Sequence, residues 1–187
     1  QVHYVTTGKA EKNQMSVGIR YAKETIQKQA RHKVLSARGF TIPPGAAAQP
    51  VASTKTIEDN ATTLALFVHM HLRGKYTRFF AHYPDGKSET LLVIPNYSFD
   101  WQMPYVYPVD GGKKLPAGTK IECASQFDNS AFNPFNPDPN VTVEYGPQTF
   151  HEMMDGYIFY VIDNENLNLQ VDPKTGQAIT KTASAAP

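Results

Sequence analysis

Short runs of β-forming residues recur through the chain, and turn signals rich in Pro, Gly, Asp and Asn separate them. The predicted strands cover residues 64–72, 76–83, 90–94, 120–127, 141–145 and 156–162. The turn signals lie at 84–86, 110–112 and 116–118, with a long loop at 133–140. Of the 187 residues, 14 are Pro, 12 are Gly and 11% are aromatic, which favours many short strands over a helical bundle. We therefore expect an all-β protein, an antiparallel jelly-roll-like β-sandwich.

The two ends of the chain differ from this central part. Residues 1–5 and 17–21 are short β-forming segments, whereas residues 23–38 mix Lys, Gln and Glu with only weak helical spacing. A proline turn follows at 43–45, so we place a domain boundary or a crossover just before Gly39. Residues beyond Asn164 are polar and Ala-rich, and we interpret them as a tail. We expect the chain to begin inside a larger polypeptide.

Charge, hydropathy and cysteine content narrow the classes of function. The 18 Lys and Arg balance 17 Asp and Glu, and no basic cluster is present, so the sequence makes no electrostatic case for nucleic acid or an anionic membrane. The longest apolar run is well below the roughly 18 residues of a membrane span. The single cysteine, Cys123, excludes an internal disulfide framework and a multi-cysteine zinc site. Function must therefore come from specific residues.

Two histidines share one face of the predicted strand at 64–72. Alternation puts the apolar residues Leu64, Leu66, Val68, Met70 and Leu72 on the core face. The opposite face carries Thr63, Ala65, Phe67, His69 and His71. The two imidazoles then lie roughly 6–7 Å apart along the strand, which is half of a metal site. The alternation alone equally allows two solvated histidines at an edge.

A third ligand has to come from another segment. The candidates are the carboxylates and His3, His82, His151, Met153 and Met154. We interpret His82, just before a turn, as an exposed loop residue. A methionine ahead of the strand at 156–162 could lean out of the sheet, although methionines beside strands usually fill cores. A thioether with two imidazoles suits copper better than zinc, so copper is the predicted metal.

Several motifs resemble one known family. They are 69–75 (HMHLRGK), 42–45 (IPPG), and 152–153 (EM) followed by 157–160 (YIFY). This order and spacing resemble the C-terminal domain of the copper type II, ascorbate-dependent monooxygenases, which include peptidylglycine alpha-hydroxylating monooxygenase and dopamine beta-monooxygenase. Segments 97–102, 127–130 and 136–139 look more like the bacterial branch of that family. The resemblance covers roughly residues 1–162.

The resemblance implies a domain organisation and a location. The family has two jelly-roll-like sandwiches that each hold one copper and face each other across a solvent-filled cleft. Residues 1–36 would then be the C-terminal end of an N-terminal copper monooxygenase-like domain, 37–165 the C-terminal sandwich, and 166–187 a polar tail. The family works outside the cytoplasm, so a periplasmic or secreted protein is expected.

The resemblance also implies the copper ligands and the reaction. His69, His71 and Met153 match the ligands of the dioxygen-binding copper, and His3 matches one histidine of a second, electron-storing copper. The other histidines of that second site would come from an upstream domain or a partner chain, so one complete site is expected here. The implied activity is hydroxylation of a C–H bond of a small-molecule substrate by dioxygen and a one-electron donor such as ascorbate. Cys123 matches one cysteine of a disulfide found in animal members of the family, and Met154 stands where those members have the other cysteine.

The chain departs from the peptide-hydroxylating members at the substrate residues. Phe67 replaces an arginine that binds the substrate carboxylate, and Asp155 replaces its asparagine partner, so only Tyr157 of that group remains. A glycine-extended peptide is therefore not the expected substrate. Phe67 indicates an apolar or aromatic compound, and Phe67 and Tyr157 are the candidate substrate-binding residues. Tyr157 could equally be an ordinary strand aromatic.

Three other functions stay open. The chain could be a non-catalytic structural or interaction module in an extracytoplasmic assembly, or it could bind copper for storage or electron transfer without oxygen chemistry. Asp128, Asn129 and Asp138 are donors of the kind that calcium uses, but their spacing matches no EF-hand, and turn chemistry explains them more simply.

Overall fold

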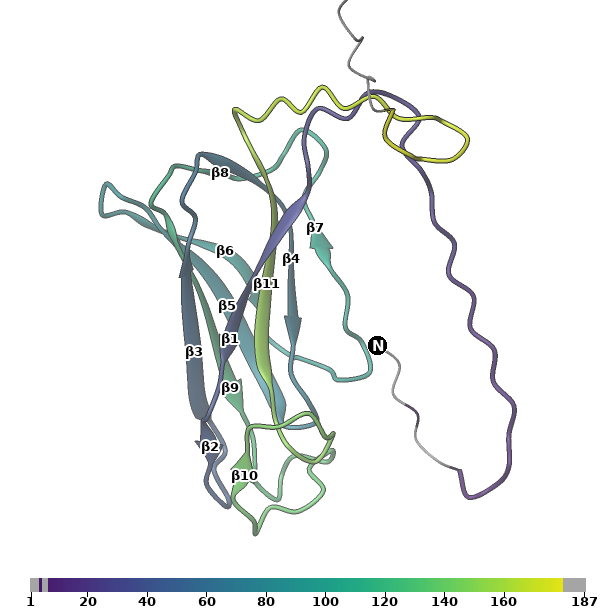
Figure 1. The fold of residues 1–187 in the computed structure, drawn as a ribbon. Coiled ribbons are helices and arrows are strands. Elements are labelled where there is room, and N and C mark those ends of the chain that lie inside the picture. Colours follow the sequence, from purple (N-terminus) through teal and green to yellow (C-terminus); the bar gives the residue numbers. More distant parts are fainter. Residues whose placement is uncertain (1–3, 5–6, 180–187) are drawn as a thin grey trace, which may run out of the picture. The chain divides into compact units, whose positions relative to one another are not determined.

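The computed structural model describes Tyr4 and residues 7–179 (Figure 1). The chain divides into two compact units, one made of residues 27–167 and the other of residues 1–26 with 168–187. All eleven strands of the described residues lie in the first unit, and those residues form no helix. The predicted all-β class is confirmed.

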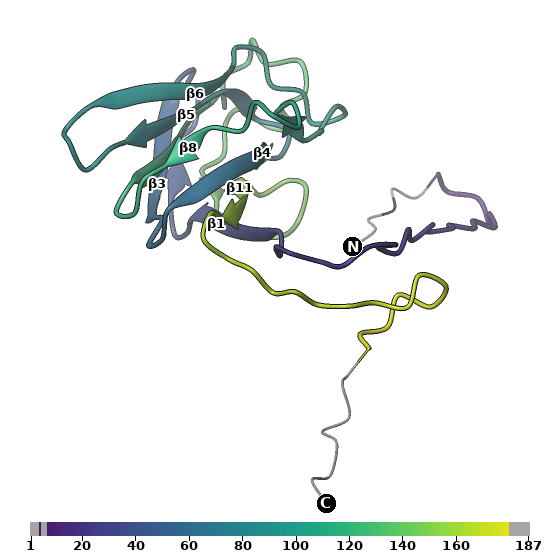
Figure 2. The same ribbon diagram turned by 90° about the horizontal axis from the view of Figure 1, so that it is seen from above.

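Two antiparallel sheets form the unit of residues 27–167. The first sheet has the order β1 (Arg31–Ala37), β11 (Met154–Ile162), β4 (Ala61–His69) and β7 (Tyr105–Val106), and β8 (Lys114–Leu115) also pairs with β4. The second has the order β3 (Gln49–Thr56), β9 (Lys120–Phe127), β5 (Gly74–His82) and β6 (Ser88–Ile94). The short strands β2 (Thr41–Ile42) and β10 (Val143–Glu144) pair separately. Figure 2 shows the two sheets as facing layers, so this unit is a jelly-roll-like β-sandwich.

The core lies between the two sheets. Leu66, Val68 and Met70 are buried, as the predicted alternation requires, and they belong to one cluster with Phe79 of β5 and Ile158 of β11. Burying side chains of this size contributes about 1.5–3 kcal/mol each, which is the main stabilisation of a sandwich.

The sheets approach closely at Gly156 of β11. A β-carbon built at Gly156 would lie 2.7 Å from Sγ of Cys123 on β9, closer than real side chains approach. Cys123 is fully buried and unpaired, and Met154 is fully buried as well. A glycine is needed at residue 156 because Cys123 already fills the space between the sheets.

A β-bulge in β4 changes which residues face the core. Ala65 pairs with Phe159 but Thr63 pairs with Tyr160, so Leu64 is an extra residue in the ladder. Thr63 is consequently 0% exposed and lies on the core side, whereas alternation placed it on the histidine face. That prediction was wrong because strict alternation assumes an unbroken register.

The predicted strand at 120–127 matches β9, and those at 76–83, 90–94 and 156–162 match β5, β6 and β11 closely. Residues 17–21 form no strand, and the segment 1–5 lies almost entirely outside the described residues. The strand β1, inside the stretch with weak helical spacing, pairs along its whole length with β11. The predicted division of the chain into residues 1–36, 37–165 and 166–187 stays a prediction.

In the smaller unit, short bridges join Ile26 to Leu169 and Val171 to Ala178. Gly176 closes the turn with a φ of 70°, and a β-carbon there would meet the ring of Tyr21 at 2.3 Å. Among the described residues, no helix has the length and apolar character needed to cross a membrane.

Candidate metal centre

The two predicted histidine ligands lie together at the end of β4. His69 is the last residue of the strand, and the ring centroids of His69 and His71 are 5.0 Å apart, with the ring planes at 74°. Between them, the backbone of Met70 leaves the ladder, because its N–H donates to the Tyr97 hydroxyl at 3.0 Å and its carbonyl accepts from that hydroxyl at 2.7 Å. Tyr97 therefore holds the chain in the path that brings the two rings together.

A side-chain amide orients the ring of His69. Nδ1 of His69 lies 2.7 Å from Oε1 of Gln102, and Nε2 of Gln102 donates to the carbonyl of Phe99 at 2.9 Å. The amide nitrogen is thus committed to Phe99, so its oxygen faces the ring. In the neutral ring this arrangement puts the proton on Nδ1 of His69 and the lone pair on Nε2.

A backbone carbonyl orients the ring of His71 in the same way. Nδ1 of His71 lies 3.0 Å from the carbonyl oxygen of His151. A carbonyl can only accept, so the lone pair of His71 also lies on Nε2. Histidines that bind metals typically donate their other N–H to an oxygen in this manner. His71 is 4% exposed, so the pair is not two solvated histidines.

Glu152 and Arg73 form a buried charged network under the histidines. The carboxylate of Glu152 accepts from the backbone N–H of His71 at 2.8 Å and from that of Arg73 at 2.6 Å. Arg73 donates through Nε to Asn129 and through Nη1 to the Phe150 carbonyl, each at 2.9 Å. Burial raises the pKa of Glu152 to about 7 and lowers the pKa of Arg73.

The predicted thioether ligand follows Glu152 directly. Asp155 pairs with His69 across β11 and β4, so their side chains share one face, and alternation puts Met153 on that face too. The ladder between β11 and β4 ends at Asp155 and His69, and Met153 directly precedes β11. Met153 is half-buried, while Met154 points into the core. The role of Met153 as a ligand stays a prediction.

The side chains of His82 and His151 make other contacts. His82 ends β5 on the second sheet and contacts Ser88 and Glu122, each at 2.8 Å. The ring of His151 packs on Phe150, with centroids 4.5 Å apart, and its buried Nδ1 has no hydrogen-bond partner. His3, predicted to belong to a second copper site, lies outside the described residues. The described part of the chain contains no cluster of three or more His, Cys, Asp or Glu side chains that could hold a metal.

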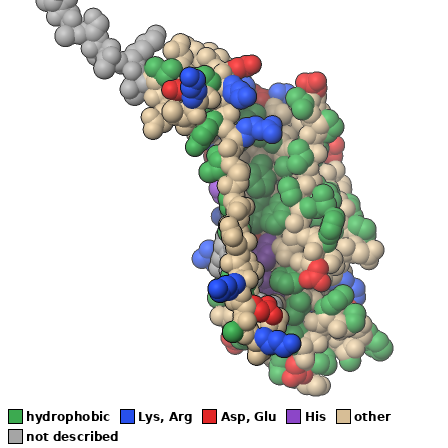
Figure 3. All heavy atoms as spheres, turned by 90° about the vertical axis from the view of Figure 1, so that its right-hand side faces the viewer, with side chains coloured by type: hydrophobic (Ala, Val, Ile, Leu, Met, Phe, Trp, Pro, Cys, Tyr) green, Lys and Arg blue, Asp and Glu red, His purple; other side chains and the backbone are tan. Residues whose placement is uncertain are grey.

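Aromatic side chains continue the face that carries His69. The rings of Phe67 and Tyr157, the predicted substrate residues, are 5.5 Å apart, and Tyr157 stacks on Phe159 at 6.4 Å. His32 of β1 lies 6.0 Å from the Phe159 ring. Burial raises the pKa of Tyr157. Figure 3 shows histidine side chains next to hydrophobic ones.

Sequence reasoning missed several of these residues. His32 and Phe159 could have been found from the alternation in residues 31–37 and 155–161. Gln102 lies in the loop before β7, and no sequence spacing relates it to His69.

Asp155 adds a buried carboxylate to this face. It is 7% exposed, lies opposite His69 on β4 and Ser36 on β1, and its Oδ1 has no hydrogen-bond partner. The side chain therefore sits between the histidine pair and the edge strand of the sheet.

The polar residues of the loop after β9 serve the fold. Asp128 accepts from Ser130 and Lys75, and the Asn129 amide donates to the carbonyls of Pro43 and Val141. These contacts within the chain are those of turn chemistry.

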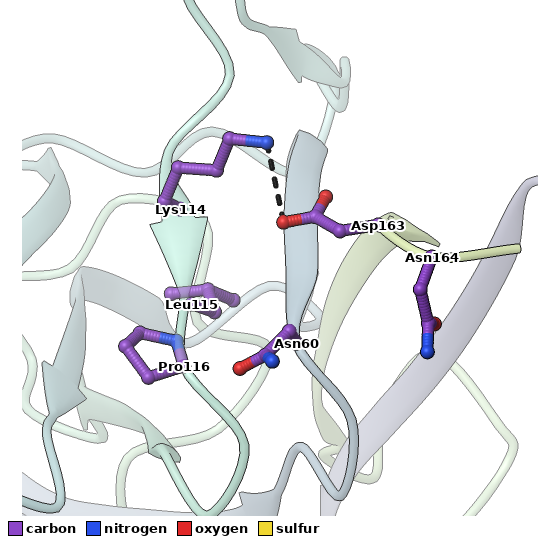
Figure 4. Close-up of a pocket in the computed structure, with 6 residues that line it drawn as sticks. All are labelled: Asn60, Lys114, Leu115, Pro116, Asp163 and Asn164. Atoms are coloured by element: carbon purple, nitrogen blue, oxygen red, sulfur yellow. Dashed lines mark hydrogen bonds and ion pairs between the residues drawn. The ribbon is translucent and has the colours of Figure 1, made fainter.

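A surface hollow lies at the other end of β4. Asn60, Lys114, Leu115, Pro116, Asp163 and Asn164 line it (Figure 4). Lys114 and Asp163 form an ion pair at 3.2 Å across it. Asn60 precedes the first residue of β4 and His69 is its last, so the hollow and the histidine pair are separated by the length of the strand.

Comparison with known proteins adds only distant likenesses. No family model matches the chain, and no curated protein matches it. A structure of infectious bursal disease virus Gx strain has 11% identity and a TM-score of 0.36, over 74% of this chain and 34% of that one. The VP2 subviral particle of infectious bursal disease virus has 11% identity and a TM-score of 0.33, over 73% and 33%.

The virus-like particle of the extra small virus of the prawn Macrobrachium rosenbergii has 9% identity and a TM-score of 0.29, over 88% of this chain and 97% of that one. The chain spans about a third of the length of the first two proteins. At these TM-scores the likenesses carry no argument about activity. The fold and the site define a β-sandwich protein with an oriented pair of histidines on one sheet face.

Proposed function

We propose that this chain binds copper through His69, His71 and Met153. The observation that carries the proposal is the histidine pair, with ring centroids 5.0 Å apart and each Nδ1 against an oxygen acceptor. Two imidazoles oriented through Nδ1, together with the thioether that follows the segment in contact with His71, form a donor set that fits copper in its reduced state.

The fuller proposal is a copper-dependent monooxygenase that hydroxylates a C–H bond with dioxygen and a one-electron reductant such as ascorbate. These residues would hold the copper, which would supply one-electron redox chemistry toward dioxygen. The chain itself orients the two rings through Gln102 and the His151 carbonyl. Phe67 and Tyr157 offer an aromatic surface on the same sheet face, which suits an apolar or aromatic small molecule.

Further partners belong to the same proposal. An upstream domain or a partner chain would supply the remaining histidines of a second copper site, together with His3. The proposed location is outside the cytoplasm, in the periplasm or as a secreted protein.

Copper loading of the purified chain tests the binding proposal. We expect one copper per chain after loading and desalting, and loss of that copper in the double variant His69→Ala/His71→Ala. His82→Ala, which removes a histidine from the other sheet, is the matched control and should keep it. A wild-type chain without bound copper would contradict the proposal.

A non-catalytic structural module is the second candidate. A buried hydrogen-bond network joins the segment after β4, the segment before β11 and the loop after β9, and its members are Arg73, Glu152 and His71. A network of this kind can serve stability alone. This candidate expects no copper binding, unchanged assembly in His69→Ala and no oxygen consumption with ascorbate. Bound copper without oxygen uptake in the presence of ascorbate would instead indicate storage or electron transfer.

A further inference from the structure

The predicted copper ligands come from two distant segments, and one carboxylate joins those segments. Glu152 is 81 positions from His71, and its Oε2 accepts the backbone N–H of His71 at 2.8 Å. Its Oε1 accepts the N–H of Arg73 at 2.6 Å. Glu152 is 0% exposed, so both bonds are shielded from water. The carboxylate spans the turn that follows the histidine pair.

The backbone of Glu152 is fixed on its other side. Its N–H donates to the carbonyl of Glu144 at 3.1 Å, and its carbonyl accepts from the N–H of Gly146 at 3.1 Å. A carboxyl group has two oxygens, so one side chain can hold two N–H groups. Residue 152 is therefore held by four hydrogen bonds, two through the side chain and two through the backbone.

Two consecutive residues contact His71, and the next residue along the chain carries the predicted thioether ligand. The carbonyl of His151 accepts from Nδ1 of His71, and the carboxylate of Glu152 accepts from its N–H. Met153, the third residue, carries the thioether. The segment that brings the thioether thus holds His71 at both its ring and its backbone.

We propose that Glu152 is a positioning residue, which fixes His71 relative to Met153 so that imidazole and thioether can bind one copper ion. This inference rests on the proposed copper site. Loss of the carboxylate would remove two of the hydrogen bonds that join residues 71–73 to the segment before β11, leaving those of the His151 and Phe150 carbonyls. We expect the thioether of Met153 then to be placed less precisely relative to the ring of His71.

Glu152→Gln tests the inference with almost no change of shape. The amide has one oxygen, so one of the two N–H donors would face an NH₂ group and lose its acceptor. In the full chain loaded anaerobically with Cu(I), X-ray absorption should show a copper–sulfur distance for the wild type and a weakened or absent one for Glu152→Gln. Competition with a Cu(I) chelator should show an affinity about 10- to 100-fold lower.

Glu122→Gln is the matched control, because Glu122 also contacts a histidine, His82, but lies on the other sheet. It should keep both the sulfur signal and the affinity. If Glu152→Gln does not fold, Glu152→Asp keeps the charge but is one methylene shorter, and the same loss of sulfur is expected. Retention of the sulfur signal and the affinity in the folded variant overturns the inference.

A double-mutant cycle separates positioning from general stability. If Glu152 acts through Met153, then Glu152→Gln should cost little further Cu(I) affinity in a Met153→Leu background, whereas an independent structural effect would lower the affinity equally in both. Equal losses therefore contradict the inference. If the wild type binds no copper, the proposed function itself is contradicted. If the wild type shows a copper–sulfur bond and Glu152→Gln keeps it, only the role of Glu152 is contradicted.

Discussion

Each imidazole of the histidine pair is oriented by a different kind of oxygen. His69 depends on a side chain, Gln102, which is itself fixed by the Phe99 carbonyl, while His71 depends on the backbone of His151. A single substitution can therefore remove the support of His69, whereas no substitution removes the carbonyl that holds His71. The two rings should respond differently to mutation.

Replacing Gln102 by Leu should weaken copper binding without unfolding the protein. The variant removes the only acceptor seen at Nδ1 of His69 in the described residues, so the ring loses its fixed tautomer. We expect Cu(I) affinity to fall about tenfold in chelator competition, as for losses of similar supporting bonds. Gln126→Leu, an exposed change on β9, is the control and should bind copper like the wild type. Unchanged affinity in Gln102→Leu would show that Gln102 does not orient a ligand.

The thiol of Cys123 should be inert in the folded protein. Burial raises its pKa to about 12, so at pH 8 almost none of it is the reactive thiolate. A chromogenic disulfide reagent should therefore report no thiol in the native chain and one thiol per chain in concentrated denaturant. Rapid reaction of the native protein at pH 8 would mean that β9 and β11 separate readily.

At the scale of the elements, the contact between Gly156 and Cys123 sets the spacing of the two sheets. Gly156→Ala should destabilise the fold by about 1–3 kcal/mol, because the added methyl group would overpack the core against Sγ. Urea unfolding followed by fluorescence measures this change. Gly18→Ala, where a β-carbon meets nothing within 4 Å, is the control. A Gly156→Ala variant as stable as the wild type would mean that the sheets can move apart at no cost.

The strands that sequence patterns predicted are those with two apolar or aromatic faces or a clear alternation, such as β5, β9 and β11. The edge strands β1 and β3 escaped prediction because charged residues such as Lys33 and Lys55 interrupt the faces that carry the buried Leu35 and Val51, as charged residues often do in edge strands. The histidine pair could be predicted, since alternation is local. The roles of Gln102 and Glu152 could not, because they depend on the path of a loop and on pairing across 81 positions.

At the scale of the whole unit, polar contacts tie the start of residues 27–167 to its end. Arg31, the first residue of β1, donates to both oxygens of Glu165, at 3.0 and 2.5 Å, and the N–H of Gln29 donates to the same carboxylate at 2.7 Å. The ammonium of Lys28 contacts the carbonyls of Ile162 and Asp163. The chain therefore enters and leaves the sandwich at one place, beside the paired strands β1 and β11.

This closure should make stability depend on pH in acid. The hydrogen bond and charge of Arg31 lower the pKa of Glu165 to about 2, from an ordinary value of 4.5. A carboxyl with a lowered folded-state pKa stabilises the fold above its unfolded pKa, and that contribution is lost as the pH falls through the folded value. The wild type should therefore be more stable than Glu165→Gln at pH 6, and the difference should shrink between about pH 4.5 and pH 2. Urea unfolding of both proteins across this range measures the difference, and Glu144→Gln, an exposed change on β10, should show no such trend. A difference that stays constant down to pH 2 would mean that the ionised carboxylate does not hold the ends of the sandwich together.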